Sequence, residues 1–302
     1  MLLFPAASWF HKSSASGNTV CRSKRPASTE PLDPTKTILE LKTVKDIRAL
    51  QRGLEVLRLL NVHNGSTLSN IVRLANLPKS TTYRILHNLC SAGYVERDSQ
   101  DSRYRLTPLV LRLSGGYEES QWITEVAKPL IHELGRKVIY PITISTIYGL
   151  EMLVRDTTSS ESAMSLDYYG VGTTIPLFYS SSGKTYLAFC RDESRETILA
   201  ACQKSGHPDH AMAKDREMIN LMLRRIREDG YAFDFRSPRP KAAGKMSTIC
   251  VPILGDTDLI GSLAMRYIDS AVSSSEVVQN YLPILKKYAE KISAGVHQLD
   301  AI

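Results

Sequence analysis

Three successive segments in the amino-terminal third of the chain have apolar residues at every third or fourth position, a spacing that predicts helices with one buried face. The first begins at Asp46 and ends before Asn64-Gly65, the second follows the capping pair Ser66-Thr67, and the third covers residues 79–92. The residues expected to be buried are Ile47, Leu50, Leu54, Leu57 and Leu60 in the first helix, Leu68, Ile71, Leu74 and Ala75 in the second, and Thr82, Ile85, Leu86 and Leu89 in the third.

Two short segments of alternating polarity follow, at residues 94–98 and 103–106, on either side of the polar turn 99–102. Alternation with a period of two predicts a β-hairpin. A tight break at Asn76-Leu77-Pro78 separates the second helix from the third. Helix, helix, turn, helix and hairpin is the order of a winged helix-turn-helix, and we assign residues 43–108 to such a domain.

The remaining pattern predicts a linker helix at residues 109–122, loosened by Gly115-Gly116, and a second domain of mixed strands and helices at 123–302. That domain begins with a helix from Ile123 to Lys137. Residues 1–42 are rich in Ser, Thr, Pro and basic side chains without periodicity, and we expect a disordered leader. The fold class is therefore α+β with two domains. Strands are expected at 142–147, 151–156, 246–254 and 259–268, and helices at 181–190, 194–204, 215–229 and 274–298.

Composition excludes two classes of protein. The chain has 302 residues, of which 43% are hydrophobic, but no window approaches the roughly 18 uninterrupted apolar residues of a membrane helix. The opening MLLFPAASWF lacks the basic start and the cleavage site of a signal peptide. The five cysteines are odd in number and scattered, which favours a reducing, cytoplasmic compartment.

Charge is concentrated where the winged helix is predicted. The whole chain has a net charge of +7, and residues 45–106 carry 10 Lys and Arg against 5 Asp and Glu, whereas residues 107–302 carry 22 against 23. A local positive field favours a polyanionic partner, and double-stranded DNA is the partner that this fold suggests. The alternative is a solvated basic surface on a module that serves protein contacts.

The second helix of a helix-turn-helix enters the major groove, so its outward face must carry hydrogen-bonding side chains. Arg84 lies one turn into the third helix and has the donors to bind guanine O6 and N7 together. On the hairpin, arginines alternate with Tyr104 and Leu106, so that they point away from the core toward phosphate. The candidate DNA-binding residues are Lys79, Ser80, Thr81, Arg84 and Asn88 on the helix and Arg97, Arg103 and Arg105 on the wing.

Catalytic and metal motifs are incomplete. Ser182-Gly183-Lys184-Thr185 resembles part of a phosphate-binding loop, but the required earlier glycine is Phe178. His132-Glu133 does not extend to a zinc-protease motif, and Cys202, His207 and His210 have no fourth ligand. We therefore expect no catalytic residues, no metal and no cofactor.

The sequence resembles the IclR family of bacterial transcriptional regulators. The marks of its DNA-binding half are RGLEVLRLL, LPKSTTYRIL, GYVERD and YRLTP, and those of its effector-binding domain, a GAF-like α/β fold, are SSGKTYLAFC, REDGYAFDFR, STICVPIL and LIGSLAMRY. The segments WITEVAKPL, YPITISTIYGLEMLVRDTT and LPILKKYAEKI are most similar to activators of 3-hydroxyphenylpropionate and related aromatic-acid catabolism.

The resemblance implies an effector site around the face of strand 259–268 that holds Ala264 and Arg266. The family commonly has small polar residues at these two positions, and this sequence departs from that pattern. An arginine on such a face needs an anionic partner, which is either Asp234 or another carboxylate of the protein, or an acidic effector. Tyr168 and Tyr169 are aromatic residues nearby. The implied effector-binding residues are Tyr179, Ser181, Ser182, Asp234, Met246, Thr248, Ala264 and Arg266.

The function implied is that of a ligand-responsive regulator of an aromatic-compound catabolic operon. We expect a homodimer or tetramer on operator DNA, an aromatic carboxylic acid as effector, and RNA polymerase as a further candidate partner, with no membrane contact. Effector binding would shift the placement of the winged domains through the 109–122 connector. The alternative is a small-molecule-binding enzyme or carrier whose winged helix serves protein contacts.

Overall fold

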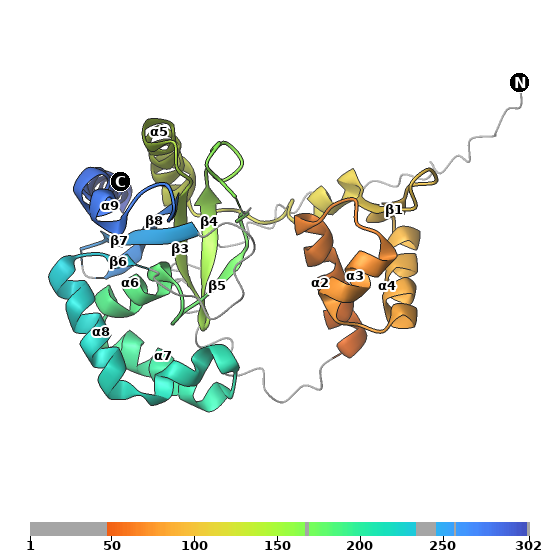
Figure 1. The fold of residues 1–302 in the computed structure, drawn as a ribbon, viewed down its shortest axis with the longest axis horizontal. Coiled ribbons are helices and arrows are strands. Elements are labelled where there is room, and N and C mark those ends of the chain that lie inside the picture. Colours follow the sequence, from red (N-terminus) through yellow and green to blue (C-terminus); the bar gives the residue numbers. More distant parts are fainter. Residues whose placement is uncertain (1–46, 167–168, 234–245, 257, 301–302) are drawn as a thin grey trace, which may run out of the picture. The chain divides into compact units, whose positions relative to one another are not determined.

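A computed structural model describes residues 47–166, 169–233, 246–256 and 258–300 (Figure 1). The predicted leader 1–42 therefore lies outside the described residues, as do Tyr168 and Asp234. The described chain forms a helical module with a small hairpin, followed by a larger domain built on one sheet.

The predicted order of helices and hairpin in the first module is confirmed. Its elements are α2 (Arg48–Val62), α3 (Leu68–Ala75), α4 (Lys79–Ser91), β1 (Val95–Arg97) and β2 (Tyr104–Leu106). Thr67 caps α3 by accepting a hydrogen bond from the Asn70 N–H at 3.3 Å, and Asn76 ends that helix at φ 49°. The left-handed backbone at Asn76 makes the tight turn into α4. The core consists of Val56, Leu60, Ile71, Leu86, Val95 and Tyr104.

The burial predicted for the start of the first helix is wrong for the single chain. Ile47, Leu50 and Leu54 are 67%, 58% and 46% exposed, while Val56 and Leu60 are fully buried. The two buried residues of α2, Val56 and Leu60, both lie in the second half of this 15-residue helix. An apolar stripe at i, i+3 and i+7 is left uncovered.

The connector is helical over a shorter stretch than predicted. A 3-10 helix, η1 (Pro108–Leu113), follows the wing, a turn covers residues 114–116, and residues 117–120 have no regular structure. Pro108 and the Thr107 side chain define the start of η1, since Thr107 accepts the Leu109 N–H at 3.2 Å. Gly115-Gly116 accounts for its end, because glycine makes helix continuation unfavourable.

The second domain contains a fully antiparallel six-stranded sheet in the order β5-β4-β3-β8-β7-β6. The four predicted strands are confirmed, and the sequence missed the two at the edges, which have three and two residues. Strands this short carry too few positions for alternation to be visible. The strands are β3 (Ile142–Tyr148), β4 (Glu151–Thr157), β5 (Thr174–Pro176), β6 (Ala232–Phe233), β7 (Met246–Leu254) and β8 (Leu259–Ile268).

Helices cover both faces of the sheet (Figure 1). One face, with Ile142, Ile144 and Leu263, packs against η2 (Trp122–Ala127), α5 (Lys128–Val138) and α10 (Leu282–Asp300) in one apolar cluster. The other face packs against α6 (Ser181–Phe189), which is covered in turn by α8 (Arg216–Asp229). The remaining helices are α7 (Asp192–Ser205), η3 (Pro208–Lys214) and α9 (Ser274–Asn280).

The last predicted helix, 274–298, is interrupted. It divides at Tyr281 into α9 and α10, where the φ of Tyr281 is −113°. Pro283 follows directly in the first turn of α10. Proline lacks the N–H that would continue the hydrogen bonds of α9 and is tolerated in the first turn of a helix, so the break falls just before it.

Candidate DNA-binding surface and effector-binding face

Helix α4 has the surface that a recognition helix needs. Lys79, Ser80, Arg84 and Asn88 are exposed, whereas Thr81 is half-buried. The opposite side is anchored by Thr82, which is buried and donates its hydroxyl to the Pro78 carbonyl at 3.1 Å. Four of the five side chains predicted on this helix therefore face outward together.

The sequence prediction missed two side chains on this exposed face. Tyr83 is 49% exposed and its ring lies 6.5 Å from that of His87, one turn later. Both are hydrogen-bonding aromatic residues next to Arg84. The signal was present, because residues three and four apart share a helix face, but we interpreted only the charged and small polar residues.

The wing arginines are held by contacts within the hairpin. Arg105 donates to Asp98 Oδ2 at 2.8 Å and to Asp101 Oδ2 at 2.7 Å. The hydrogen bond from Arg105 lowers the pKa of Asp101 to about 2. Arg103 donates to the Gly65 carbonyl at 2.9 Å, and the Arg97 guanidinium lies 5.8 Å from the centre of the Tyr104 ring. Arg105 therefore shapes the turn of the wing, while Arg97 and Arg103 are more exposed.

The strand register brings several predicted effector residues together. Thr248 pairs with Arg266 and Cys250 with Ala264 across β7 and β8, and Met246 pairs with Ile268 on the same strands. Positions two apart on a strand share a face, so Met246, Thr248, Ala264 and Arg266 lie on the side of the sheet that α6 covers. Met246 and Thr248 are half-buried, and Ala264 and Arg266 are buried.

Helix α6 brings its first turn onto this face. Ser180 caps the helix by accepting the Gly183 N–H at 3.0 Å, and Ser181 and Ser182 are 1% and 3% exposed. A Cβ at position 183 would lie 2.0 Å from the Leu177 carbonyl oxygen, so only glycine fits. This close approach explains the Gly-Lys pair without a phosphate-binding loop. Tyr179 is half-buried just before the cap.

The Arg266 guanidinium stacks on an aromatic ring. Its central carbon lies 4.2 Å from the centre of the Tyr169 ring, and the residue is only 9% exposed. A cation–π contact at that distance stabilises a charge removed from water. Tyr169, one of the two tyrosines noted near this face in the sequence, therefore contacts Arg266.

Sequence reasoning also missed a layer of buried small polar residues on this face. Ser145 Oγ lies 2.9 Å from Ser262 Oγ, and Thr143 Oγ1 lies 3.1 Å from Thr157 Oγ1. Cys250 is fully buried, and burial raises the pKa of its thiol to about 11, so it is neutral at physiological pH. A polar layer inside a domain is costly unless its groups bond to each other or to a ligand. The alternation of Thr143 and Ser145 with isoleucines was the sequence signal.

The residues that suggested a metal have other roles. Cys202 is 2% exposed, and burial raises the pKa of its thiol to about 12. His210 Nδ1 lies 2.6 Å from Ser205 Oγ, and the centre of its ring lies 5.3 Å from that of His207, with the two rings tilted by 51°. These contacts order the segment between α7 and η3.

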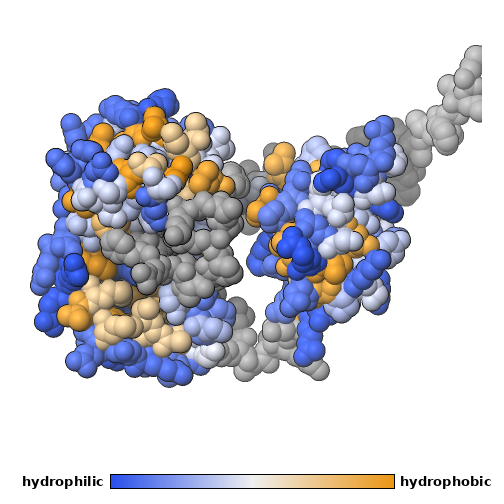
Figure 2. Space-filling model, in the orientation of Figure 1, coloured by the Kyte–Doolittle hydropathy of each residue, from blue (hydrophilic) through white to orange (hydrophobic). Residues whose placement is uncertain are grey.

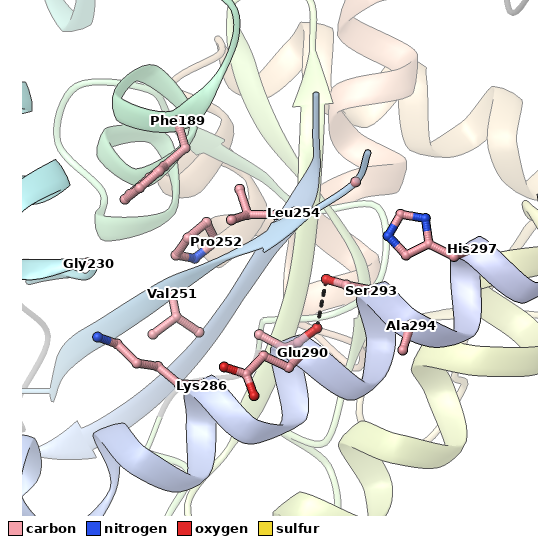
Figure 3. A pocket seen from close by; sticks show the side chains of 12 residues that line it. Phe189, Gly230, Val251, Pro252, Leu254, Lys286, Glu290, Ser293, Ala294 and His297 are labelled. Carbon is pink, nitrogen blue, oxygen red and sulfur yellow. Dashed lines mark hydrogen bonds between the residues drawn. The ribbon is translucent and has the colours of Figure 1, made fainter. Parts of the chain in front are cut away.

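A separate groove lies where the end of β7 meets α10, near the end of α6 (Figure 3). Its volume is about 550 Å³. None of the predicted effector residues that the structure describes is among its lining residues. Phe189, Val251, Pro252 and Leu254 supply apolar surface, and Lys286, Glu290 and His297 come from one side of α10.

The surface is mostly hydrophilic in the view of Figure 2, with separate hydrophobic areas on both domains. Within the described part of the chain, no helix is both long and apolar enough to cross a bilayer.

A winged helix-turn-helix joined to a sheet with a buried polar face defines a ligand-responsive DNA-binding regulator. The sequence model of the IclR helix-turn-helix domain matches residues 49–99, and that of the bacterial transcriptional regulator IclR C-terminal domain matches residues 116–294. The chain belongs to the IclR family of transcriptional regulators. It is therefore a regulator and not an enzyme.

Two curated relatives are similar over most of the chain. The HTH-type transcriptional regulator BhcR of Paracoccus denitrificans is 27% identical over 218 residues, which are 72% of this chain and 75% of BhcR. The Pca regulon regulatory protein of Pseudomonas putida is 24% identical over 240 residues, which are 78% of this chain and 80% of that protein.

Two solved structures confirm the two-domain fold. IclR of Thermotoga maritima superposes with a TM-score of 0.57 at 21% identity, covering 83% of this chain and 99% of that one. An IclR homolog of Microbacterium hydrocarbonoxydans, solved as a complex with 4-hydroxybenzoate, gives a TM-score of 0.54 at 24% identity with the same coverage, 83% and 99%.

Proposed function

We propose that this regulator controls an aromatic-compound catabolic operon and responds to an aromatic carboxylic acid. The observation that carries this proposal is the buried Arg266 stacked on Tyr169 at 4.2 Å, on the face that also holds Thr248, Ser181 and Ser182. Guanidinium groups bind carboxylates through two parallel hydrogen bonds, and tyrosine can pack against a ring. The similar structure that was solved as a complex with 4-hydroxybenzoate supports the same ligand class.

Substitution of Arg266 tests the ligand class. Arg266→Leu should abolish binding of an acidic effector while operator binding stays intact, and Arg266→Lys should weaken binding less, because lysine keeps the charge without the planar fork. Calorimetry with 4-hydroxybenzoate, 3-hydroxyphenylpropionate and phenylacetate measures this. Arg225→Leu, whose side chain is 84% exposed on α8, is the matched control. Unchanged affinity for Arg266→Leu would show that this arginine serves the fold alone.

We infer that α4 and the wing bind operator DNA. Lys79, Ser80, Arg84 and Asn88 supply hydrogen bonds from the exposed face of α4, with Thr81 at its edge, and the wing adds Arg97, Arg103 and Arg105. Selection of random DNA duplexes by the purified full chain should enrich one near-palindromic sequence. Absence of enrichment would contradict operator binding and would leave protein contacts as the role of the winged helix.

The exposed stripe of α2 supports assembly into a homodimer or tetramer. Ile47, Leu50 and Leu54 form a contiguous apolar strip on one helix, which is typical of an interface. Leu50→Glu should reduce the mass measured by sedimentation equilibrium and weaken operator binding, whereas Gln51→Glu on the neighbouring exposed position should not. An unchanged mass for Leu50→Glu would place the interface elsewhere. RNA polymerase is a further partner that we propose for an activator of this kind.

A further inference from the structure

Strand β4 contains a β-bulge whose extra residue is Arg155. The register shifts there, because Ile144 of β3 pairs with Asp156 while the next residue, Ser145, pairs with Val154. Arg155 therefore has no paired residue in the backbone register of β3 and β4. Bulges commonly redirect a side chain beside a functional site.

The Arg155 side chain binds the connector and β3 at the same time. It forms an ion pair with Glu119, to which its Nε donates at 3.3 Å, and it donates to Ser120 Oγ at 3.1 Å. A third bond goes to Thr146 Oγ1 at 3.0 Å. The Arg155 guanidinium thus links residues 119 and 120 of the connector to the sheet by hydrogen bonds.

This ion pair is largely removed from water. The side chains of Arg155 and Glu119 are 16% and 17% exposed. Burial alone would raise the pKa of Glu119, but the hydrogen bonds from Arg155 and from the Ser120 N–H outweigh it, and the pKa is lowered. Both groups are therefore charged at physiological pH. Loss of one partner would leave the other charge buried without compensation. We therefore expect the ion pair to be either fully formed or fully broken.

The hydrogen bonds of Arg155 join the sheet next to the proposed effector face to the connector that leads to the DNA-binding module. On the sheet side, Thr146 is adjacent to Ser145, whose hydroxyl bonds to Ser262 in the polar layer of the effector face. On the other side, the connector after Leu113 is a turn and then an irregular segment up to Ser120. An irregular segment takes its course from the contacts at its ends, so the course of the connector depends on the bulge.

We propose that Arg155 is a positioning residue that couples the effector-binding face to the DNA-binding module by holding Glu119 and Ser120 on the bulge of β4. A ligand that displaces the Ser145–Ser262 hydrogen bond shifts β3 at the neighbouring Thr146. The shift alters the contacts of Arg155 and therefore the position of Glu119 and Ser120 in the connector. The inference rests on the proposed function, since it requires operator binding at one end. Coupling free energies are reciprocal, so operator binding must also change the bulge.

The reciprocity gives a test that needs no knowledge of the effector. Amide hydrogen exchange of the full chain is measured by mass spectrometry with and without the operator obtained by selection from random duplexes. In the wild type, the operator should change exchange in residues 142–157 by about fivefold or more, the lower end of the range typical of allosteric coupling. In Glu119→Gln this change should vanish, while exchange at residues 117–121 becomes faster without DNA. Glu118→Gln, at the exposed neighbouring position, is the matched control and should behave as wild type.

A charge exchange keeps the test valid if one variant folds poorly. Glu119→Arg combined with Arg155→Glu re-forms the pair with reversed polarity and should restore the operator-dependent change, which a purely structural loss would not allow. If the wild type binds its operator and residues 142–157 do not respond, the coupling role is overturned while the DNA-binding function stands. If no operator is bound at all, the proposed function fails and this inference fails with it.

Discussion

The two surfaces that we propose as functional are built in opposite ways. The proposed DNA-binding surface uses side chains from one helix and one hairpin within residues 79–105, and most of them are exposed. The proposed effector face joins β3, β7, β8 and α6, and its side chains are largely buried. Ser145 and Ser262, which are in contact on this face, are 117 residues apart in the chain. A surface made by exposed side chains of one segment tolerates substitution of a single residue. A face made by strands and a helix that are distant in sequence depends on the close packing of these elements.

The largest effect is expected at Gly183, in the first turn of the helix that covers the proposed effector face. Gly183→Ala places a methyl group 2.0 Å from the Leu177 carbonyl oxygen, and backbone atoms cannot move aside cheaply. We expect a loss of about 3 kcal/mol or more in the free energy of unfolding of the second domain. Denaturant unfolding followed by circular dichroism measures it.

Gly53 in α2 provides the matched control in the DNA-binding module. A Cβ there has nothing within 4 Å, and the residue lies inside a helix. Gly53→Ala should stabilise the protein by about 0.5–1 kcal/mol, because alanine loses less backbone entropy in a helix. Equal effects at the two glycines would remove the contrast between the surfaces.

The next effect concerns base recognition by α4. Arg84→Ala should cost about 1–3 kcal/mol of binding free energy at the selected operator and relax discrimination at one base pair. Titration of operator and scrambled duplexes by fluorescence anisotropy measures both affinities, with Arg224→Ala on α8 as an exposed control far from this helix in sequence. Equal weakening on both duplexes would make Arg84 a phosphate contact instead.

The same contrast explains what could be predicted from the sequence. The helices of the first module and the outward position of Arg84 follow from a local period, which any contiguous amphipathic segment shows. The pairing of Thr248 with Arg266 depends on strand register, and the contact between Arg155 and Glu119 depends on a bulge. Neither is encoded in spacing along one segment.

Two failures have a different origin. Leu50 and Leu54 fit the helical period but are exposed, since the pattern identifies an apolar face without saying what covers it. The ion pairs of Arg105 with Asp98 and Asp101 were missed because arginine on a wing was interpreted only as a phosphate contact. In both cases the sequence predicts where a side chain lies on its helix or hairpin, but it does not predict which group that side chain contacts.

A smaller effect is expected from Arg103 on the wing. Its guanidinium is tied to the Gly65 carbonyl and lies 3.5 Å from Asp101, yet the side chain is 51% exposed. If it contacts one phosphate, Arg103→Ala should reduce the slope of log affinity against log salt by about one unit, equally for specific and random DNA. Anisotropy titrations from 50 to 300 mM salt, roughly the range in which such slopes are measured, would show it. An unchanged slope would assign Arg103 to the structure of the hairpin.

The smallest effect is a protonation inside the wing that leaves the rest of the molecule unchanged. The hydrogen bond from Arg105 lowers the pKa of Asp101 to about 2 from the ordinary 3.8. A depressed pKa means that the pairing contributes to stability above the unfolded-state pKa and is lost only as the pH falls through the folded-state value. At pH 4 the carboxyl carbon of Asp101, observed by NMR with labelled aspartate, should still show the ionised shift, whereas an ordinary aspartate is close to half protonated. In Arg105→Leu the midpoint should rise toward the ordinary value. A wild-type midpoint near 3.8 would show that Arg105 does not hold Asp101 in the turn of the wing.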